Sequence, residues 1–193
     1  MSLELKVRNT TLTGLLVIEK PVRKDPRGTF TRLYGQDELE KTGINISAKH
    51  VNTSTSTQAG TLRGIHFQFP PFAETKVVSC TSGALWDVGI DLRPRSPTRF
   101  KWHAELLTPD NGLSLVIPAG FGHAFLTMEP NTTAVYIVSE VYSPQHEFGL
   151  RFDDPKIGIS WPRDPQVLSD KDQSWGYLDS VINELSIGFS SIE

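Results

Sequence analysis

Cysteine is nearly absent from this sequence, which contains a single thiol at Cys80. One cysteine excludes an internal disulfide framework and is typical of proteins from a reducing compartment. Its neighbours Val78, Ser79 and Thr81 have the character of a strand, so we expect a buried structural thiol. The sequence also lacks a signal peptide and any apolar run of membrane-spanning length. We therefore expect a soluble cytoplasmic protein without a membrane partner.

An excess of charge of either sign is lacking too. The 19 lysines and arginines nearly balance the 22 aspartates and glutamates, which gives a formal net charge of −3. This balance argues against general attraction to nucleic acids or membrane surfaces and leaves room for a local anion site. The 193 residues contain no repeats or linker-like segments, and we expect one domain spanning residues 1–193.

Helical periodicity is scarce. Short apolar runs alternate with turn residues among 13 prolines and 15 glycines, a pattern typical of an all-β sandwich or barrel. Short helices are expected only over residues 36–41 and 180–185. In the last long apolar run, Tyr136 alternates with Val135 and Ile137. A half-solvated strand and a barrel interior that holds a polar ligand both fit this alternation.

One short stretch combines a base with a cation. His66 lies in the sequence Leu-Arg-Gly-Ile-His-Phe-Gln, and Lys76 follows ten residues later. Removing a proton from carbon next to a carbonyl requires a base, and the enolate oxygen that forms needs a nearby cation. Each residue also has an ordinary interpretation, because strand histidines are often core or surface residues and lysines are usually solvated charges. The pair alone suggests proton-transfer chemistry without establishing it.

A second informative stretch covers residues 112–123, where a strand enters a Pro/Gly turn that delivers His123 to the next strand. This stretch resembles the second motif of the cupin superfamily of small jelly-roll barrels. In metal-binding cupins this histidine is a ligand, together with two histidines and a glutamate from an earlier motif. That motif is broken here, because Gln68 replaces its second histidine and Glu74 follows a Pro-Pro pair. Two histidines and one carboxylate make an incomplete site, so we expect no metal and no other cofactor.

Taken together, the motifs resemble the dTDP-4-dehydrorhamnose 3,5-epimerase family, which are metal-independent cupins. The similarity extends from about residue 14 to about residue 172, most of the chain. It implies an all-β cupin fold, a double-stranded β-helix (jelly-roll) barrel with a few short surface helices. The segments that carry the resemblance, in order, are residues 25–30, 62–68, 70–76, 87–98, 117–125, 142–147, 152–155, 159–162 and 168–172.

The resemblance implies an isomerase that inverts C3, C5 or both of a nucleotide-linked 4-keto-6-deoxy sugar. His66 would be the base, and Asp172 would orient its ring and stabilise the imidazolium. Lys76 would stabilise the enolate oxygen. Tyr136 would return a proton to the opposite face of the sugar, as a phenol that is neutral at working pH.

The resemblance also implies contacts to the sugar and to the nucleotide diphosphate. The implied contact residues are Arg27, Phe30, Asn52, Arg63, Gln68, Asp87, His123, Tyr142, Glu147 and Lys171. Tyr142 would stack on the base, and the cationic residues would bind the diphosphate. Because Arg63 and His66 would point to opposite faces of a regular strand, we expect a β-bulge or a role across a subunit boundary. The family forms homodimers, and Arg27 and Phe30 could serve the neighbouring subunit's site.

Two positions depart from the family pattern. Arg32 stands where the family usually has glutamate, and His50 lies where it usually has glutamine, which suggests a changed nucleotide or sugar. Residues 173–193 fall outside the matched pattern, and their apolar side chains should pack on the barrel or on a partner subunit. The alternatives are a ketoisomerase on the same scaffold, a non-catalytic sugar- or nucleotide-binding cupin, and a metal-dependent oxygenase or isomerase.

Overall fold

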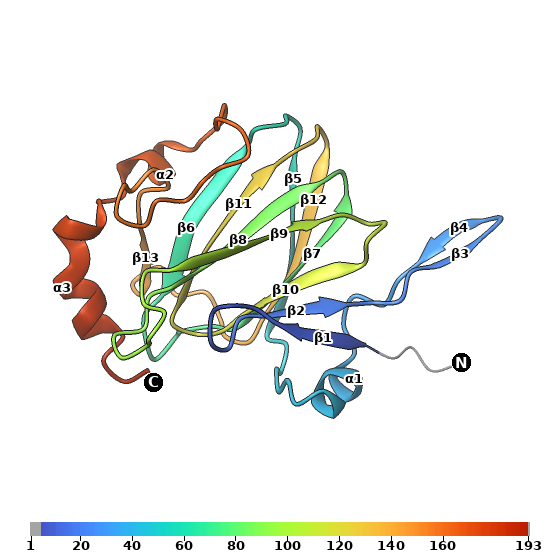
Figure 1. Cartoon of the computed structure of the whole chain (residues 1–193), viewed down its shortest axis with the longest axis horizontal. Helices are drawn as coiled ribbons and strands as arrows, with labels where there is room; N and C mark the ends of the chain where they lie inside the picture. The colour runs from blue at the N-terminus through green and yellow to red at the C-terminus, as the bar shows by residue number, and fades with distance from the viewer. Residues whose placement is uncertain (1–4, 193) are drawn as a thin grey trace.

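Two antiparallel β-sheets face each other in the computed structural model, which describes residues 5–192 (Figure 1). The six-stranded sheet contains, in spatial order, β1 (Lys6–Asn9), β2 (Leu16–Glu19), β10 (Leu113–Ile117), β7 (Lys76–Ser82), β12 (Thr132–Val138) and β5 (His50–Ser56). The five-stranded sheet contains β13 (Glu147–Gly149), β6 (Leu62–Gln68), β11 (Phe121–Thr127), β8 (Leu85–Asp91) and β9 (Trp102–Leu107). The predicted all-β class is confirmed.

The space between the sheets is filled by alternate strand residues. Val78 and Leu115 of the six-stranded sheet meet Leu85 and Phe125 of the five-stranded sheet in one buried cluster. Complete burial of such a side chain contributes about 1.5–3 kcal/mol. Tyr136 packs against the same cluster, so of the two interpretations of its strand the barrel interior is correct. The face of β12 that carries Tyr136 therefore points inward.

Short helices cover the outer faces of both sheets. α1 (Gln36–Lys41) lies where it was predicted and places Leu39 over Ile18 and Ile137 of the six-stranded sheet. α3 (Leu178–Gly188) is longer than predicted and packs Leu185 on the five-stranded sheet (Figure 1). The C-terminal segment thus packs on the barrel, one of its two expected positions. Among the described residues, no helix has the length and apolar character needed to cross a membrane.

The single thiol is buried, as predicted. Cys80 lies on β7 within the cluster between the sheets, and burial raises its pKa to about 11. A thiol with this pKa is protonated at neutral pH and is a poor nucleophile.

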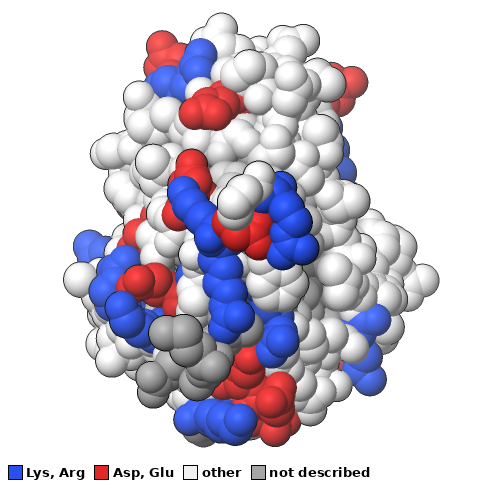
Figure 2. Space-filling model, turned by 90° about the vertical axis from the view of Figure 1, so that its right-hand side faces the viewer, with Lys and Arg blue, Asp and Glu red and all other residues white. Residues whose placement is uncertain are grey.

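One element projects away from the two sheets. β3 (Arg23–Asp25) and β4 (Gly28–Phe30) form a hairpin, here called the arm, that extends from the end of β2 (Figure 1). Phe30 on the arm is 57% exposed. Figure 2 shows the side of the molecule from which the arm projects, where basic side chains alternate with acidic ones. Ion pairs join Arg27 to Asp25 within the arm and Lys24 of the arm to Asp110. The arm thus carries an exposed aromatic side chain together with paired charges at its surface.

Candidate active site

A β-bulge in β6 brings two functional side chains to one face of the strand. His66 pairs with His123 of β11, whereas Arg63 pairs with Phe125, so two residues of β6 lie opposite one residue of β11. Such a bulge reverses the alternation, and Arg63 and His66 line the same cavity. The expected bulge is therefore confirmed. Gly64 within it has φ +121°, and a Cβ there would lie 2.6 Å from the Cα of Ala124.

Two adjoining cavities open between the sheets, with volumes of about 370 and 320 Å³. His66, Lys76 and Tyr136 line both, and we call the combined space the cleft. The first cavity is also lined by His50, Asn52, Phe67, Gln68, Glu74, Val138, Tyr142 and Glu147. The second is also lined by Ser54, Arg63, His123, Phe125, Ser169, Lys171 and Asp172. Most residues implied by the resemblance thus meet in one place.

His66 is held by a carboxylate from the C-terminal part of the chain. Its Nε2 is hydrogen-bonded to Oδ1 of Asp172 on α2 (Asp170–Ser174). Ser169 caps this short helix and accepts a hydrogen bond from the Asp172 backbone N–H at 3.1 Å. Burial alone would raise the pKa of Asp172, but hydrogen bonds from His66, Ser169 and the Gly64 backbone outweigh it and lower the pKa. An ionised Asp172 therefore faces the histidine ring.

Lys76 has a partner that the sequence interpretation did not include in the active site. Its Nζ lies 3.1 Å from Oε1 of Glu74, and both side chains are largely buried. This ion pair holds the ammonium inside the cleft that His66 and Tyr136 also line. Glu74 precedes Lys76 by two residues, a spacing that could have indicated this ion pair. The sequence interpretation, however, treats Glu74 only as a possible metal ligand.

His66 and Tyr136 approach the cleft from opposite walls. His66 belongs to β6 of the five-stranded sheet and Tyr136 to β12 of the six-stranded sheet. Burial raises the pKa of Tyr136, with the Glu74 charge adding to the effect and Arg63 opposing it. The phenol therefore stays protonated at neutral pH. A flat ring bound between the sheets would meet a base on one face and an acid on the other.

A second histidine–carboxylate pair lies behind the first. Nε2 of His123 is 2.7 Å from Oδ1 of Asp87, and both side chains are buried. His123 lines the cleft, whereas Asp87 lies behind it and keeps Oδ2 without a hydrogen-bond partner among the described residues. This pair supports the wall beside His66. Residues 5–192 contain no group of three or more His, Cys, Asp or Glu side chains arranged to hold a metal ion.

Glu147 connects the outer residues of the cleft. Its Oε2 accepts hydrogen bonds from the Tyr142 hydroxyl at 2.5 Å and from the Lys171 ammonium at 2.6 Å. Asn52 lines the same cavity from the edge strand β5. Gln68 also lines it, but its amide is bonded to backbone groups of Phe72, Val141 and Ser143. Gln68 therefore holds the neighbouring loops in position.

Comparison with known proteins matches this arrangement to one family. The sequence profile of dTDP-4-dehydrorhamnose 3,5-epimerase matches residues 9–180. The protein of that name from Sinorhizobium fredii is 45% identical over 191 residues, covering 98% of this chain and 96% of its own. The chain belongs to the dTDP-4-dehydrorhamnose 3,5-epimerase family. The resemblance, the cupin-type β-sandwich and the epimerase class predicted from the sequence are all confirmed.

Solved structures of epimerases from this family agree closely with the fold. The Bacillus anthracis dTDP-4-dehydrorhamnose 3,5-epimerase, solved with TDP and PPi bound, is 40% identical with a TM-score of 0.87 and covers 90% of this chain and 99% of its own. The Legionella pneumophila epimerase, solved with dTDP-4-keto-L-rhamnose, is 33% identical with a TM-score of 0.88 and covers 94% of this chain and 96% of its own.

Besides Asp87, two further residues implied by the epimerase family pattern do not line the cleft. Arg27 and Phe30 are on the arm, and neither lines the cavities around His66. Arg27 instead pairs with Asp25 at 2.7 Å. Arg32 also lies away from the cleft and pairs with Glu38 at 2.5 Å, whereas His50 lines it. Within one chain, therefore, only one of the two departures from the family pattern reaches the candidate active site.

Proposed function

We propose that this protein inverts C3, C5 or both of a nucleotide-diphosphate-linked 4-keto-6-deoxy sugar, by removing a proton from one face and adding one to the other. The single observation that supports this best is the opposition of His66, bonded to Asp172, and Tyr136 across one cleft that Lys76 also lines. A non-catalytic binding protein has no need for the His66–Asp172 pair.

His66 removes the proton from carbon next to the 4-keto group. Because the ionised Asp172 only accepts hydrogen bonds, the Nε2 that faces it carries the proton and Nδ1 supplies the lone pair. The imidazolium that forms is stabilised by the carboxylate. The Lys76 ammonium stabilises the negative charge on the enolate oxygen. Tyr136 donates its phenolic proton to the opposite face of the carbon, which inverts the centre.

The outer part of the cleft suits a nucleotide diphosphate. Arg63 and Lys171 supply positive charge, and charge-assisted hydrogen bonds to phosphate are among the strongest in proteins. Tyr142 is exposed beside them and offers a flat surface for a base. The relatives' names favour thymidine. The predicted change of nucleotide now rests on His50 alone, since Arg32 pairs with Glu38 outside the cleft.

We further propose a homodimer in which the arm completes the neighbouring subunit's site. The arm presents Phe30 and Arg27 to solvent in the single chain. The edge strand β5 next to the cleft is also open, with Val51 64% exposed. An unpaired strand edge is a ready surface for a strand from another chain. The single buried thiol and a sugar-nucleotide substrate support a cytoplasmic location.

The nucleotide is tested by competitive binding of dTDP, CDP and GDP to the purified protein. At least tenfold tighter binding of dTDP supports the thymidine assignment and overturns the predicted change of nucleotide. Tighter binding of CDP or GDP, lost in His50→Gln, would support that change instead. His103→Gln is the matched control, because His103 lies on β9 and lines neither part of the cleft.

A further inference from the structure

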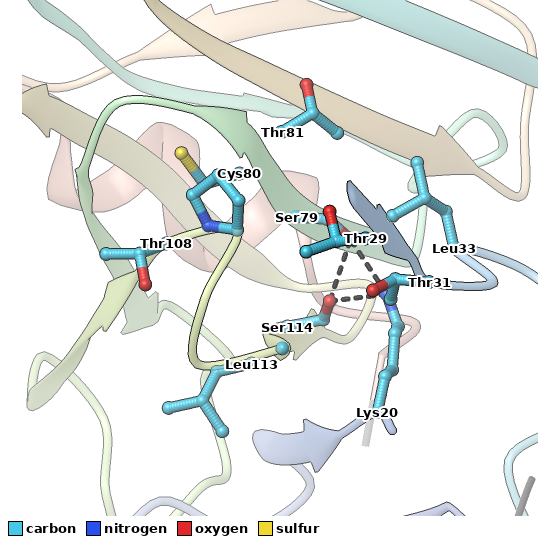
Figure 3. A pocket seen from close by; sticks show the side chains of 12 residues that line it. Lys20, Thr29, Thr31, Leu33, Ser79, Cys80, Thr81, Thr108, Leu113 and Ser114 are labelled. Atoms are coloured by element: carbon cyan, nitrogen blue, oxygen red, sulfur yellow. Dashed lines mark hydrogen bonds between the residues drawn. The ribbon is translucent and has the colours of Figure 1, made fainter. Parts of the chain in front are cut away.

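A separate cavity of about 180 Å³ lies on the outer face of the six-stranded sheet (Figure 3). It shares no lining residue with the cleft. Its wall is built from β7, β10, the loop before β10, Lys20 after β2, and Thr29 of the arm with the segment that follows it. The lining residues are Lys20, Thr29, Thr31, Leu33, Ser79, Cys80, Thr81, Thr108, Pro109, Gly112, Leu113 and Ser114.

Lys20 is only 5% exposed and is held by two hydroxyls. Its Nζ donates hydrogen bonds to Oγ of Ser79 at 2.8 Å and Oγ of Ser114 at 2.5 Å. The two serine hydroxyls are themselves 2.7 Å apart and share a hydrogen bond (Figure 3). The ammonium and both hydroxyls thus form a closed triangle on the surface of the sheet.

This triangle has more hydrogen-bond donors than its internal hydrogen bonds use. The ammonium has three N–H groups, of which the two serines accept two. The two hydroxyls contribute two further protons, of which their mutual hydrogen bond uses one. The bonds among the described residues therefore leave one N–H and one O–H for an acceptor outside the triangle. Thr29 and Thr31 add two more hydroxyls to the same cavity.

Within residues 5–192, Lys20 also has no carboxylate as an ion-pair partner. None of the residues that line the cavity is an aspartate or a glutamate. The other lysines that line a cavity, such as Lys76 and Lys171, each pair with a carboxylate. Burial lowers the pKa of Lys20 to about 8, so the amine is still mostly protonated at neutral pH. A buried cation without a counter-charge is costly, and an anion beside it would remove that cost.

We propose that Lys20, Ser79 and Ser114 form a binding site for a small oxyanion, distinct from the epimerase cleft. The cavity of about 180 Å³ is several times larger than the ~30 Å³ that one water molecule occupies in the liquid. This volume is enough for a tetrahedral anion. The spare N–H and O–H groups bind its oxygens. The site joins the segment after the arm to the sheet, and its occupant can be a free ion or a carboxylate of a second copy of this chain.

The test is NMR of protein labelled with ¹³C at lysine Cε, with inorganic phosphate or sulfate added at constant ionic strength and dTDP present to fill the cleft. The Lys20 resonance, assigned by its absence in Lys20→Met, should shift saturably. Its midpoint of titration with pH should rise by at least one unit. Phosphate affinity should fall as the pH rises above 8, because Lys20 and the neutral Cys80 are the only titratable groups among the described residues that line the cavity.

Two variants control the measurement. Ser114→Ala keeps the ammonium but removes one hydroxyl, and it should weaken phosphate binding at least threefold. Lys41→Met replaces an exposed lysine on α1 and should leave binding unchanged. A Lys20 resonance that titrates identically with and without phosphate or sulfate overturns a free-ion site. If that result is accompanied by weaker dimerisation of Lys20→Met, the counter-charge is a carboxylate of the second copy.

Discussion

The ring of His66 is hydrogen-bonded through Nε2 to the carboxylate of Asp172, a residue 106 positions later in the chain. This bond joins β6, an interior strand of the five-stranded sheet, to the five-residue helix α2. In the proposed mechanism, the C-terminal part of the molecule therefore contributes to the chemistry, even though its outermost segment departs from the family pattern.

The first prediction concerns that carboxylate. Asp172→Asn removes the negative charge that stabilises the imidazolium, and kcat/KM should fall about 10²- to 10³-fold, within the usual range for general acid–base catalysis. Asp170→Asn is the matched control on the same helix, since Asp170 is exposed. Steady-state epimerisation assays measure both variants. Equal losses in the two would indicate that helix stability, not the His66 contact, is responsible.

The second prediction separates proton removal from proton return. In Tyr136→Phe the base remains, so solvent deuterium should still enter the substrate carbon. The inverted product should form about 10²-fold more slowly, because the acid on the opposite face is gone. NMR resolves exchange without inversion from exchange with inversion. Tyr34→Phe, which loses only a hydrogen bond to the Ile46 carbonyl, is the control. Normal inversion in Tyr136→Phe would assign the acid to another residue.

The third prediction addresses the arm. If Arg27 serves the neighbouring subunit, His66→Asn and Arg27→Gln should each be nearly inactive alone. After subunits are exchanged at equal concentrations, mixed dimers should contain one intact site and restore about a quarter of the wild-type activity. Activity that stays at the level of the separate variants after verified exchange contradicts a shared site. His66→Asn mixed with a His66→Asn, Arg27→Gln double variant is the control and should remain inactive.

The fourth prediction uses the buried amine. The pKa of Lys20 is about 8 in the folded protein and 10.5 as its ordinary value, so the unfolded chain binds more protons between these limits. The contribution of Lys20 to the free energy of unfolding therefore rises with pH across this window, by about 3 kcal/mol in an anion-poor buffer. This contribution is least favourable below pH 8. Urea denaturation at fixed protein concentration measures this slope. Lys20→Met should lose the slope and Lys41→Met should keep it. A wild-type slope that survives in Lys20→Met would assign it to other groups.

Much of the fold was predictable because it depends on local patterns. Alternating apolar residues and frequent turns determine a sandwich of antiparallel strands, and the α1 segment has enough charged helix formers to be recognised. The bulge in β6 was also predictable, because Arg63 and His66 could share a ligand only if the alternation was broken between them. The resemblance supplied the roles of His66, Lys76, Tyr136 and Asp172.

The remaining features depend on contacts between distant segments. α2 is only five residues long, too short to show a helical period, and its position is set by the Ser169 cap and the bond to His66. In the sequence, Lys20 is a polar residue at the end of an apolar strand. Its buried site could not be predicted, because its partners Ser79 and Ser114 lie 59 and 94 positions away. Arg27 and Phe30 line neither part of one chain's cleft, so their role in a neighbouring subunit's site, which the resemblance implies, stays a prediction.

The most direct test of the central claim is NMR of the protein with dTDP-4-keto-6-deoxyglucose in deuterated water, with His66→Ala as the control. The account predicts deuterium at C3, C5 or both with inverted stereochemistry, and neither in the control, while dTDP binding persists in both proteins. The number of labelled positions counts the epimerised centres. A folded wild-type protein that binds dTDP but incorporates no deuterium, or a carbonyl that moves to C3, would contradict the account.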